Sequence, residues 1–191
     1  FYAQVVSGIH SVFLENDTIM LLGWNPKSKH DKGDEQERQI LHQLVDRRVD
    51  GVILRPGSEE MERSYFEEIW ERDIPLVIVD REMQQISTDF VGSADREIGR
   101  DAARHLIELG HRQLLFVGDG AVVSTSRYRE EGFRRVLSES AGASCKVINN
   151  GVGEGEDAIL QLLRGEDCPT AIFCYCDPVA EVMMKRVLEA G

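Results

Sequence analysis

The amino-acid sequence predicts an α/β protein built on parallel β-sheets. Two observations favour this class: short runs of consecutive apolar residues alternate along the chain with stretches of helical apolar spacing, and the connections between them are short. Continuous apolar runs are typical of strands buried on both faces, and such strands belong to parallel sheets that helices cover. With 191 residues, 42% of them hydrophobic, the chain can form one large domain or two small ones.

Three helices and four strands are predicted in the first half of the chain. Apolar residues recur at helical spacing over residues 5–13, 40–45 and 65–70. Continuous apolar runs, which indicate strands, occupy residues 19–22, 52–54 and 76–79, and a shorter one occupies 90–91. The long polar stretch over residues 25–39 is interpreted as a loop that leads into an exposed helix start.

The pattern restarts at Asp95, a candidate N-cap for a helix that extends to Leu109 and ends at Gly110, where a left-handed residue is wanted. The last predicted helix follows Asp177, a second candidate cap, with Pro178 at its first position. Between them we expect strands over 114–117, 147–148 and 171–174, and helical faces over 133–137 and 159–163. About eight strands in all could form one sheet or two sheets of four or so, and periodicity does not decide which.

Composition excludes several functions for this segment. Its formal net charge is −12, which repels phosphates, so it is not expected to contact DNA itself. The longest apolar patches have four or five residues, too few to span a bilayer, and no secretory signal is visible. We therefore expect no membrane association. Because the sequence opens on Phe1 rather than Met, we expect the natural start to lie upstream.

Cysteine and glycine spacing predicts neither a metal site nor a cofactor. The four cysteines form no disulfide framework, and Cys174 and Cys176 would share one face of a strand without a partner set for zinc. We interpret them as ordinary thiols of a cytoplasmic protein. The segment 118–120 lacks the third glycine of a dinucleotide fingerprint, and the signatures of P-loops, hydrolases and zinc proteases do not occur. The chain is therefore predicted not to be an enzyme.

Polar residues follow three of the predicted buried strands. In open α/β sheets, ligands bind beyond the carboxyl ends of the strands, so these residues are candidate ligand contacts. Carboxylates accept hydrogen bonds from hydroxyls, and arginine offers a rigid set of donors. The candidates are Asp80 and Arg81 after residues 76–79, Cys176 and Asp177 after 171–174, and Thr125 and Arg129 after 118–123, at the start of a helix.

Each candidate also has a purely structural interpretation. Asp80 could be a solvated turn residue, and Asp177 could serve only as a helix cap. Arg129 could pair on the surface with Glu130 or Glu131. The three strand ends together favour the ligand-binding interpretation.

The stretch from Val91 to Phe133 resembles a known pattern. Residues 91–95, Gly99 and Ala103, the run HLIELGHR at 105–112, and the later REEGF at 129–133 are similar to the signature of the LacI/GalR transcription regulators. Further similarity lies in VDGVIL at 49–54, PLVIVDR at 75–81, PTAIFC at 169–174, DPVA at 177–180 and the opening FYA. The resemblance covers almost the whole chain.

The resemblance implies a periplasmic-binding-protein fold of type I, with two Rossmann-like subdomains and a cleft between them. Residues 1–93 would form the N-terminal subdomain without its first strand, and residues 94–191 the C-terminal subdomain without its last strands. A DNA-binding headpiece would precede Phe1. The family's effector contacts match five positions of this chain: Phe1, Tyr2, Asp80, Thr125 and Arg129.

Two positions depart from the family pattern. Asn150 occupies a loop in which many members carry an aromatic residue that stacks on the ligand, and Cys176 stands where asparagine is usual. Both remain candidate ligand contacts, and they indicate an unusual effector.

The expected function is that of the effector-sensing and dimerisation core of a transcriptional regulator. A small polar ligand, sugar-like in its chemistry, would bind in the cleft of a homodimer and control operator binding allosterically. One alternative is an exported sugar-binding protein that serves a transporter or chemoreceptor. Another is an α/β enzyme that acts on a phosphosugar or nucleotide.

Overall fold

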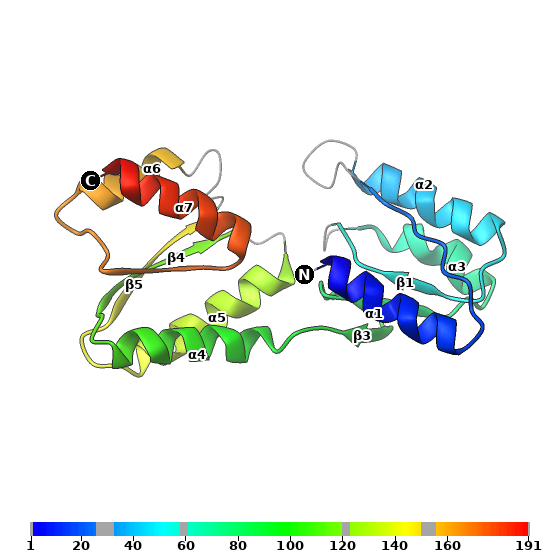
Figure 1. Ribbon diagram of the computed structural model, residues 1–191, viewed down its shortest axis with the longest axis horizontal. Coiled ribbons are helices and arrows are strands. Elements are labelled where there is room, and N and C mark those ends of the chain that lie inside the picture. The colour runs from blue at the N-terminus through cyan, green and yellow to red at the C-terminus, as the bar shows by residue number, and fades with distance from the viewer. Residues whose placement is uncertain (1, 26–32, 58–60, 120–122, 150–155, 191) are drawn as a thin grey trace. The chain divides into compact units, whose positions relative to one another are not determined.

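The α/β class with parallel sheets is confirmed. The computed structural model describes residues 2–25, 33–57, 61–119, 123–149 and 156–190, and within them two three-stranded sheets carry all the strands (Figure 1). The chain folds into two compact units, residues 1–52 with 64–75 and residues 53–63 with 76–191. Within the described residues, no helix is long and apolar enough to cross a membrane. The division expected after residue 93 stays a prediction.

The first unit is mainly helical. Its elements are α1 (Tyr2–Glu15), α2 (Gly33–Asp46), the 3-10 helix η1 (Arg63–Phe66) and α3 (Glu67–Glu71). Leu41 and Val45 of α2, together with Phe66 and Ile69, are buried at its core. Helix α1 has no buried residue, so its apolar spacing does not lead to burial within this chain.

The expected strand over residues 19–22 is wrong. Residues 18–25 form no regular structure, and Ile19 is 86% exposed and Leu22 63% exposed. The sheet nearest in sequence has the order β1-β2-β3, and no described strand pairs with this segment. An apolar run favours a strand only where a neighbouring backbone accepts and donates its hydrogen bonds.

The first sheet contains β1 (Val52–Leu54), β2 (Leu76–Val79) and β3 (Asp89–Val91). Strands β2 and β3 are parallel, with Val77 beside Asp89 and Val79 beside Val91. Their carboxyl ends therefore lie at the same edge of the sheet. This edge carries one wall of the site described below.

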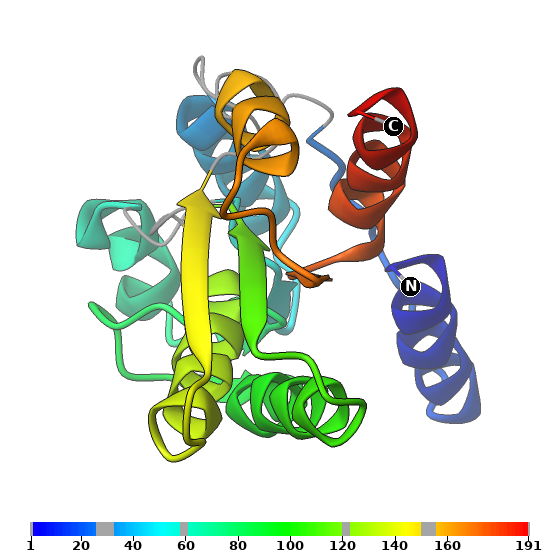
Figure 2. The same cartoon turned by 90° about the vertical axis from the view of Figure 1, so that its left-hand side faces the viewer.

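The second sheet has β4 (Gln113–Gly118) at its centre, between β5 (Ser144–Asn149) and β6 (Ala171–Cys174), and both pairs are parallel. Helices α6 (Glu156–Arg164) and α7 (Asp177–Ala190) lie above these strands, and α4 (Asp95–Glu108) and α5 (Ser124–Ser138) lie below them (Figure 1 and Figure 2).

Alternate residues of β4 supply two separate cores, because successive side chains of a strand point to opposite faces. Leu114 and Phe116 pack with Phe133 of α5, while Leu115 and Val117 pack with residues of α6 and α7. All four β4 side chains are at most 2% exposed. The continuous apolar run in the sequence thus reflects a strand covered on both faces, as predicted.

Helices α4 and α5 approach each other backbone to backbone. A Cβ atom on Gly99 would lie 2.0 Å from the carbonyl oxygen of Arg129, and one on Gly132 would lie 2.0 Å from the carbonyl oxygen of Arg96. Only glycine fits at both positions. The glycines of the motif that spans residues 91–133 therefore bring the start of α4 beside the first turns of α5, and this contact positions Asp95 and Arg129.

The ends of α4 confirm one expectation and correct another. Gly110 has φ = +92°, the left-handed conformation expected after the helix. Asp95 is not the N-cap: Ala94 occupies that position without a side-chain cap bond, and Asp95 is the first helical residue. The Asp95 carboxylate instead accepts hydrogen bonds from Ser93 and Arg129, so a tertiary contact takes the place of local capping. At α7, the helix begins at Asp177 itself, and the carbonyl of Cys176 accepts from the Ala180 amide.

Candidate ligand-binding site

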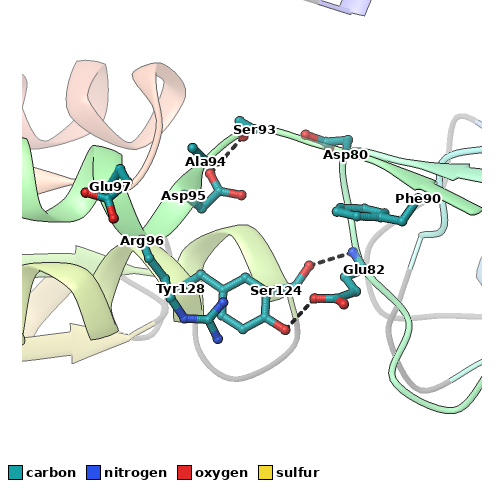
Figure 3. Close-up of a pocket in the computed structure, with 10 residues that line it drawn as sticks. All are labelled: Asp80, Glu82, Phe90, Ser93, Ala94, Asp95, Arg96, Glu97, Ser124 and Tyr128. Carbon is teal, nitrogen blue, oxygen red and sulfur yellow. Dashed lines mark hydrogen bonds between the residues drawn. The ribbon is translucent and has the colours of Figure 1, made fainter.

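The second unit contains a pocket of about 180 Å³ beside the carboxyl ends of β2 and β3. The first turns of α4 and α5 and the loop after β2 complete its walls (Figure 3). The lining combines carboxylates, hydroxyls and aromatic rings. Its residues are Asp80, Glu82, Phe90, Ser93, Ala94, Asp95, Arg96, Glu97, Ser124 and Tyr128.

Asp80 enters the pocket because the chain turns sharply after β2. Its φ is +68°, a left-handed conformation that aspartate tolerates better than most residues. Its amide donates to the carbonyl of Val91 at 2.9 Å, which ties the turn to β3. The Nε of Arg55 donates to Asp80 Oδ2 at 2.8 Å. The carboxylate is therefore held in place and its charge is offset.

Glu82 links the loop after β2 to α5. Its amide donates to Ser124 Oγ at 2.8 Å, and its Oε2 accepts from the Tyr128 hydroxyl at 2.6 Å (Figure 3). Ser124 and Tyr128 are four residues apart and share one face of α5. The guanidinium of Arg96 lies over the Tyr128 ring at 3.6 Å from its centroid and donates to Glu131 at 2.9 Å. These contacts close the lower side of the pocket.

Asp95 and Arg129 form an ion pair at the base of the site. Asp95 Oδ1 accepts from Arg129 Nε at 2.8 Å and from Ser93 Oγ at 2.9 Å. The Asp95 side chain is only 5% exposed and that of Arg129 22%. Arg129 Nη1 also donates to the Tyr175 carbonyl at 2.5 Å, so the pair joins α4, α5 and the end of β6.

A second polar cluster lies at the carboxyl ends of β4 and β6. The Tyr175 hydroxyl donates to Asp119 Oδ2 at 2.9 Å, and the Asp119 amide donates to Ser126 Oγ at 3.0 Å. Burial, with added hydrogen bonds to Cys176 and Asp119, raises the pKa of Tyr175. Burial also raises the pKa of Cys174 to about 11. Both groups are therefore neutral at physiological pH.

Of the predicted contacts, Asp80 lies in the pocket lining. Arg129 does not line the pocket, but it donates a hydrogen bond to Asp95, which does. Arg129 does not pair with Glu130 or Glu131, because the close approach of α4 and α5 offers it Asp95 instead. Arg81 is not a lining residue, and its Nη1 donates to the Gly57 carbonyl at 2.6 Å.

The remaining predicted contacts are not brought to this pocket. Thr125 is buried in the first turn of α5, and Cys176 is half-buried beside the exposed Asp177, none of them in the lining. Tyr2 is 44% exposed in the first unit. Phe1 and Asn150 lie outside the described residues. Their roles as ligand contacts stay predictions.

Sequence reasoning did not single out several lining residues. Glu82 lies in the irregular loop after β2, where no periodicity indicates orientation, and Phe90 lies in the short strand β3, whose apolar run predicted a strand but not a ligand contact. Ser124 and Tyr128 each neighbour a predicted contact, and their spacing of four residues was a usable signal for a shared face. Among the described residues, no group of three His, Cys, Asp or Glu side chains could hold a metal ion.

Comparisons with known proteins agree with this architecture. A family model described as periplasmic binding proteins and the sugar-binding domain of the LacI family matches residues 1–191. The HTH-type transcriptional repressor PurR of Photobacterium profundum is 27% identical over the whole of this chain. The chain spans 57% of that relative's length.

Two solved structures show that the similarity extends to the fold. A protein described as a ribose operon repressor of Burkholderia thailandensis has 30% identity and a TM-score of 0.83, over 98% of this chain and 68% of that one. A LacI family transcriptional regulator of Enterococcus faecalis, solved with bound ribose, has 25% identity and a TM-score of 0.78, over 100% of this chain and 67% of that one. The resemblance of residues 91–133 to the LacI/GalR signature is thus confirmed, and the chain belongs to the family of periplasmic binding proteins and LacI-type sugar-binding domains.

Proposed function

We propose that this chain is the effector-sensing and dimerisation core of a DNA-binding transcriptional regulator. The observation that carries the proposal is the pocket at the strand ends, lined by Asp80 and by hydroxyl and aromatic side chains, in a chain of this family. A sugar or sugar derivative is the proposed effector, because carboxylates bind hydroxyls and aromatic faces pack on sugar carbons. The likeness to a regulator solved with ribose supports this choice.

Asp80 and Arg129 are the proposed principal contacts. Asp80 already lines the pocket. Arg129 uses Nε and Nη1 within the protein, and its Nη2 has no partner among the described residues, so it retains donors for a ligand. Effector binding would favour one arrangement of the two predicted subdomains and thereby change operator affinity. A coupling of about 1–3 kcal/mol is enough for regulation.

The proposal extends to the partners of the protein. Operator DNA is bound through a headpiece that is not part of this sequence, and the regulator acts as a cytoplasmic homodimer without a cofactor or a reaction of its own. The names of the relatives, which are repressors and regulators, support this assignment. The net charge of the chain, −12, supports the assignment of DNA binding to the headpiece, because negative charge repels phosphates.

The test uses the whole regulator with its DNA-binding part. A thermal-shift panel of sugars, sugar phosphates and nucleobases identifies a ligand, because a molecule that binds only the folded state raises its stability. Fluorescence anisotropy of labelled operator DNA then measures DNA affinity with and without that ligand. We expect a change of at least about fivefold. A ligand that binds the protein but leaves operator affinity unchanged would contradict the regulatory assignment.

A further inference from the structure

The charged side chains around the pocket are already matched to one another, with one exception. Asp80 pairs with Arg55, Asp95 with Arg129, and Glu97 with Arg100. The one guanidinium of the lining belongs to Arg96, and it pairs with Glu131. Each of these four arginines is thus bonded to a carboxylate of the protein.

Glu82 is the exception. Its carboxylate accepts from the Tyr128 hydroxyl, and no described residue forms an ion pair with it. Phe90, which lies next to it in Figure 3, offers an apolar ring and no charge. The pocket therefore carries an unbalanced negative charge at Glu82.

The hydrogen bonds made by the lining side chains also limit the kind of molecule that the pocket can bind. The side-chain donors of the lining are largely used: Ser93 donates to Asp95, Tyr128 to Glu82, and Arg96 to Glu131. Carboxylate oxygens, by contrast, remain available as acceptors. A bound molecule must therefore supply donors.

Asp95 provides the acceptor that bears most directly on the ligand. Its side chain is 95% buried, and both of its bonds, to Ser93 and Arg129, use Oδ1. Its second oxygen has no partner among the described residues and is directed toward the side of the pocket that carries Ser124 and Glu82 (Figure 3). This oxygen can therefore accept a hydrogen bond from a donor of a bound molecule.

The start of α4 does not reverse this preference. A helix N-terminus attracts anions, but Asp95 and Glu97 both lie in the first turn of α4 and offset its positive end. A phosphate or carboxylate group is an acceptor only, so in this pocket it would meet negative charge and few side-chain donors.

We propose that the ligand of this pocket is an uncharged molecule rich in hydroxyl donors, an unphosphorylated sugar rather than a sugar phosphate, and that Asp95 and Glu82 accept its hydrogen bonds. This inference rests on the proposed function. It adds the charge class of the effector and two residues that select for it.

The experiment is isothermal titration calorimetry on the whole regulator with D-ribose, D-glucose and D-fructose, each compared with its phosphate ester. We expect at least one free sugar to bind, and its ester to bind at least about tenfold more weakly because of repulsion from Glu82. An ester that binds as tightly as its free sugar overturns this inference and leaves the proposed sensing function intact. Binding by none of the six overturns both.

A matched pair of variants assigns the selectivity to Glu82. Glu82→Gln keeps the size and one acceptor oxygen but removes the charge, so we expect the ratio between sugar and ester affinities to fall by at least about threefold. Asp101→Asn, which removes an exposed carboxylate of α4 that pairs with Arg104 outside the lining, is expected to leave that ratio unchanged. Equal ratios in Glu82→Gln and the unmodified protein would overturn the role of Glu82. Circular dichroism verifies that both variants are folded.

Discussion

Replacing Gly132 with alanine tests whether the backbone contact between α4 and α5 holds the candidate site together. The new Cβ atom would lie 2.0 Å from the Arg96 carbonyl oxygen, 2.8 Å from the carbonyl carbon and 3.1 Å from Cα. All three are backbone atoms, so no side-chain rotation relieves the contact. The helices must instead move apart by about 1 Å merely to reach 3.0 Å, the distance below which Cβ atoms essentially never approach another atom.

This movement has a predictable cost. Overpacking of a tight contact destabilises a protein by about 1–3 kcal/mol, and a gap of about 1 Å also weakens the apolar contacts of Phe133 and Ala103. Because the obstructing atoms cannot rotate away, we take the upper end, about 3 kcal/mol. The better helix propensity of alanine offsets about 1 kcal/mol of this. The net expectation is a loss of about 2 kcal/mol.

Urea unfolding followed by circular dichroism measures the loss. With a slope of about 2 kcal/mol per molar urea, the midpoint for Gly132→Ala should fall by about 1 M. The control is Gly8→Ala on α1, where a Cβ meets nothing within 4 Å, so stability should hold or rise by up to about 1 kcal/mol. A Gly132→Ala midpoint equal to that of the unmodified protein would refute the proposed close packing.

Three further predictions follow from the second unit. Asp95→Asn should lower the free energy of unfolding by about 1–3 kcal/mol, because it removes the charged acceptor of the Arg129 guanidinium in a site where both side chains are largely buried. An unchanged urea midpoint would contradict this. Phe116→Ala should cost about 3–5 kcal/mol by opening a cavity between β4 and α5, and a loss below about 1 kcal/mol would show that the core collapses around it. Because burial raises the pKa of Cys174 to about 11, its reactive thiolate is scarce at pH 8. Labelling with iodoacetamide, followed by peptide mass spectrometry, should therefore be slow at pH 8 and faster as the pH approaches 11. Labelling at pH 8 that is as fast as in urea-unfolded protein would refute the burial.

The alternation of apolar runs and helical faces was enough to predict the elements that surround β4. Its run of consecutive apolar residues indicated a strand covered on both faces, and the structure confirms that arrangement. The same reasoning was wrong at residues 19–22, where Ile19 is 86% exposed. Apolarity is a local property, whereas a strand depends on a partner that the local sequence does not reveal.

The site was predictable where a strand directs a residue into it. Asp80 follows β2 immediately, so the rule that ligands lie beyond strand ends identified it. Glu82 was not identified, since its position depends on bonds to Ser124 and Tyr128, more than 40 residues away in sequence. The pairing of Arg129 with Asp95 was missed for a related reason: it follows from the contact between two helices, which periodicity does not encode.

Calorimetric titration of the whole regulator with the sugar that stabilises it, comparing the unmodified protein with Asp80→Asn, tests most directly whether this pocket is the effector site. Asparagine tolerates the left-handed backbone at this position, so the turn is preserved. A hydrogen bond to a charged group contributes about 1.5–3 kcal/mol, which predicts at least about tenfold weaker binding in Asp80→Asn. The exposed control Asp101→Asn should bind as the unmodified protein does. Equal affinity of Asp80→Asn and the unmodified protein would contradict the assignment of the effector site to this pocket.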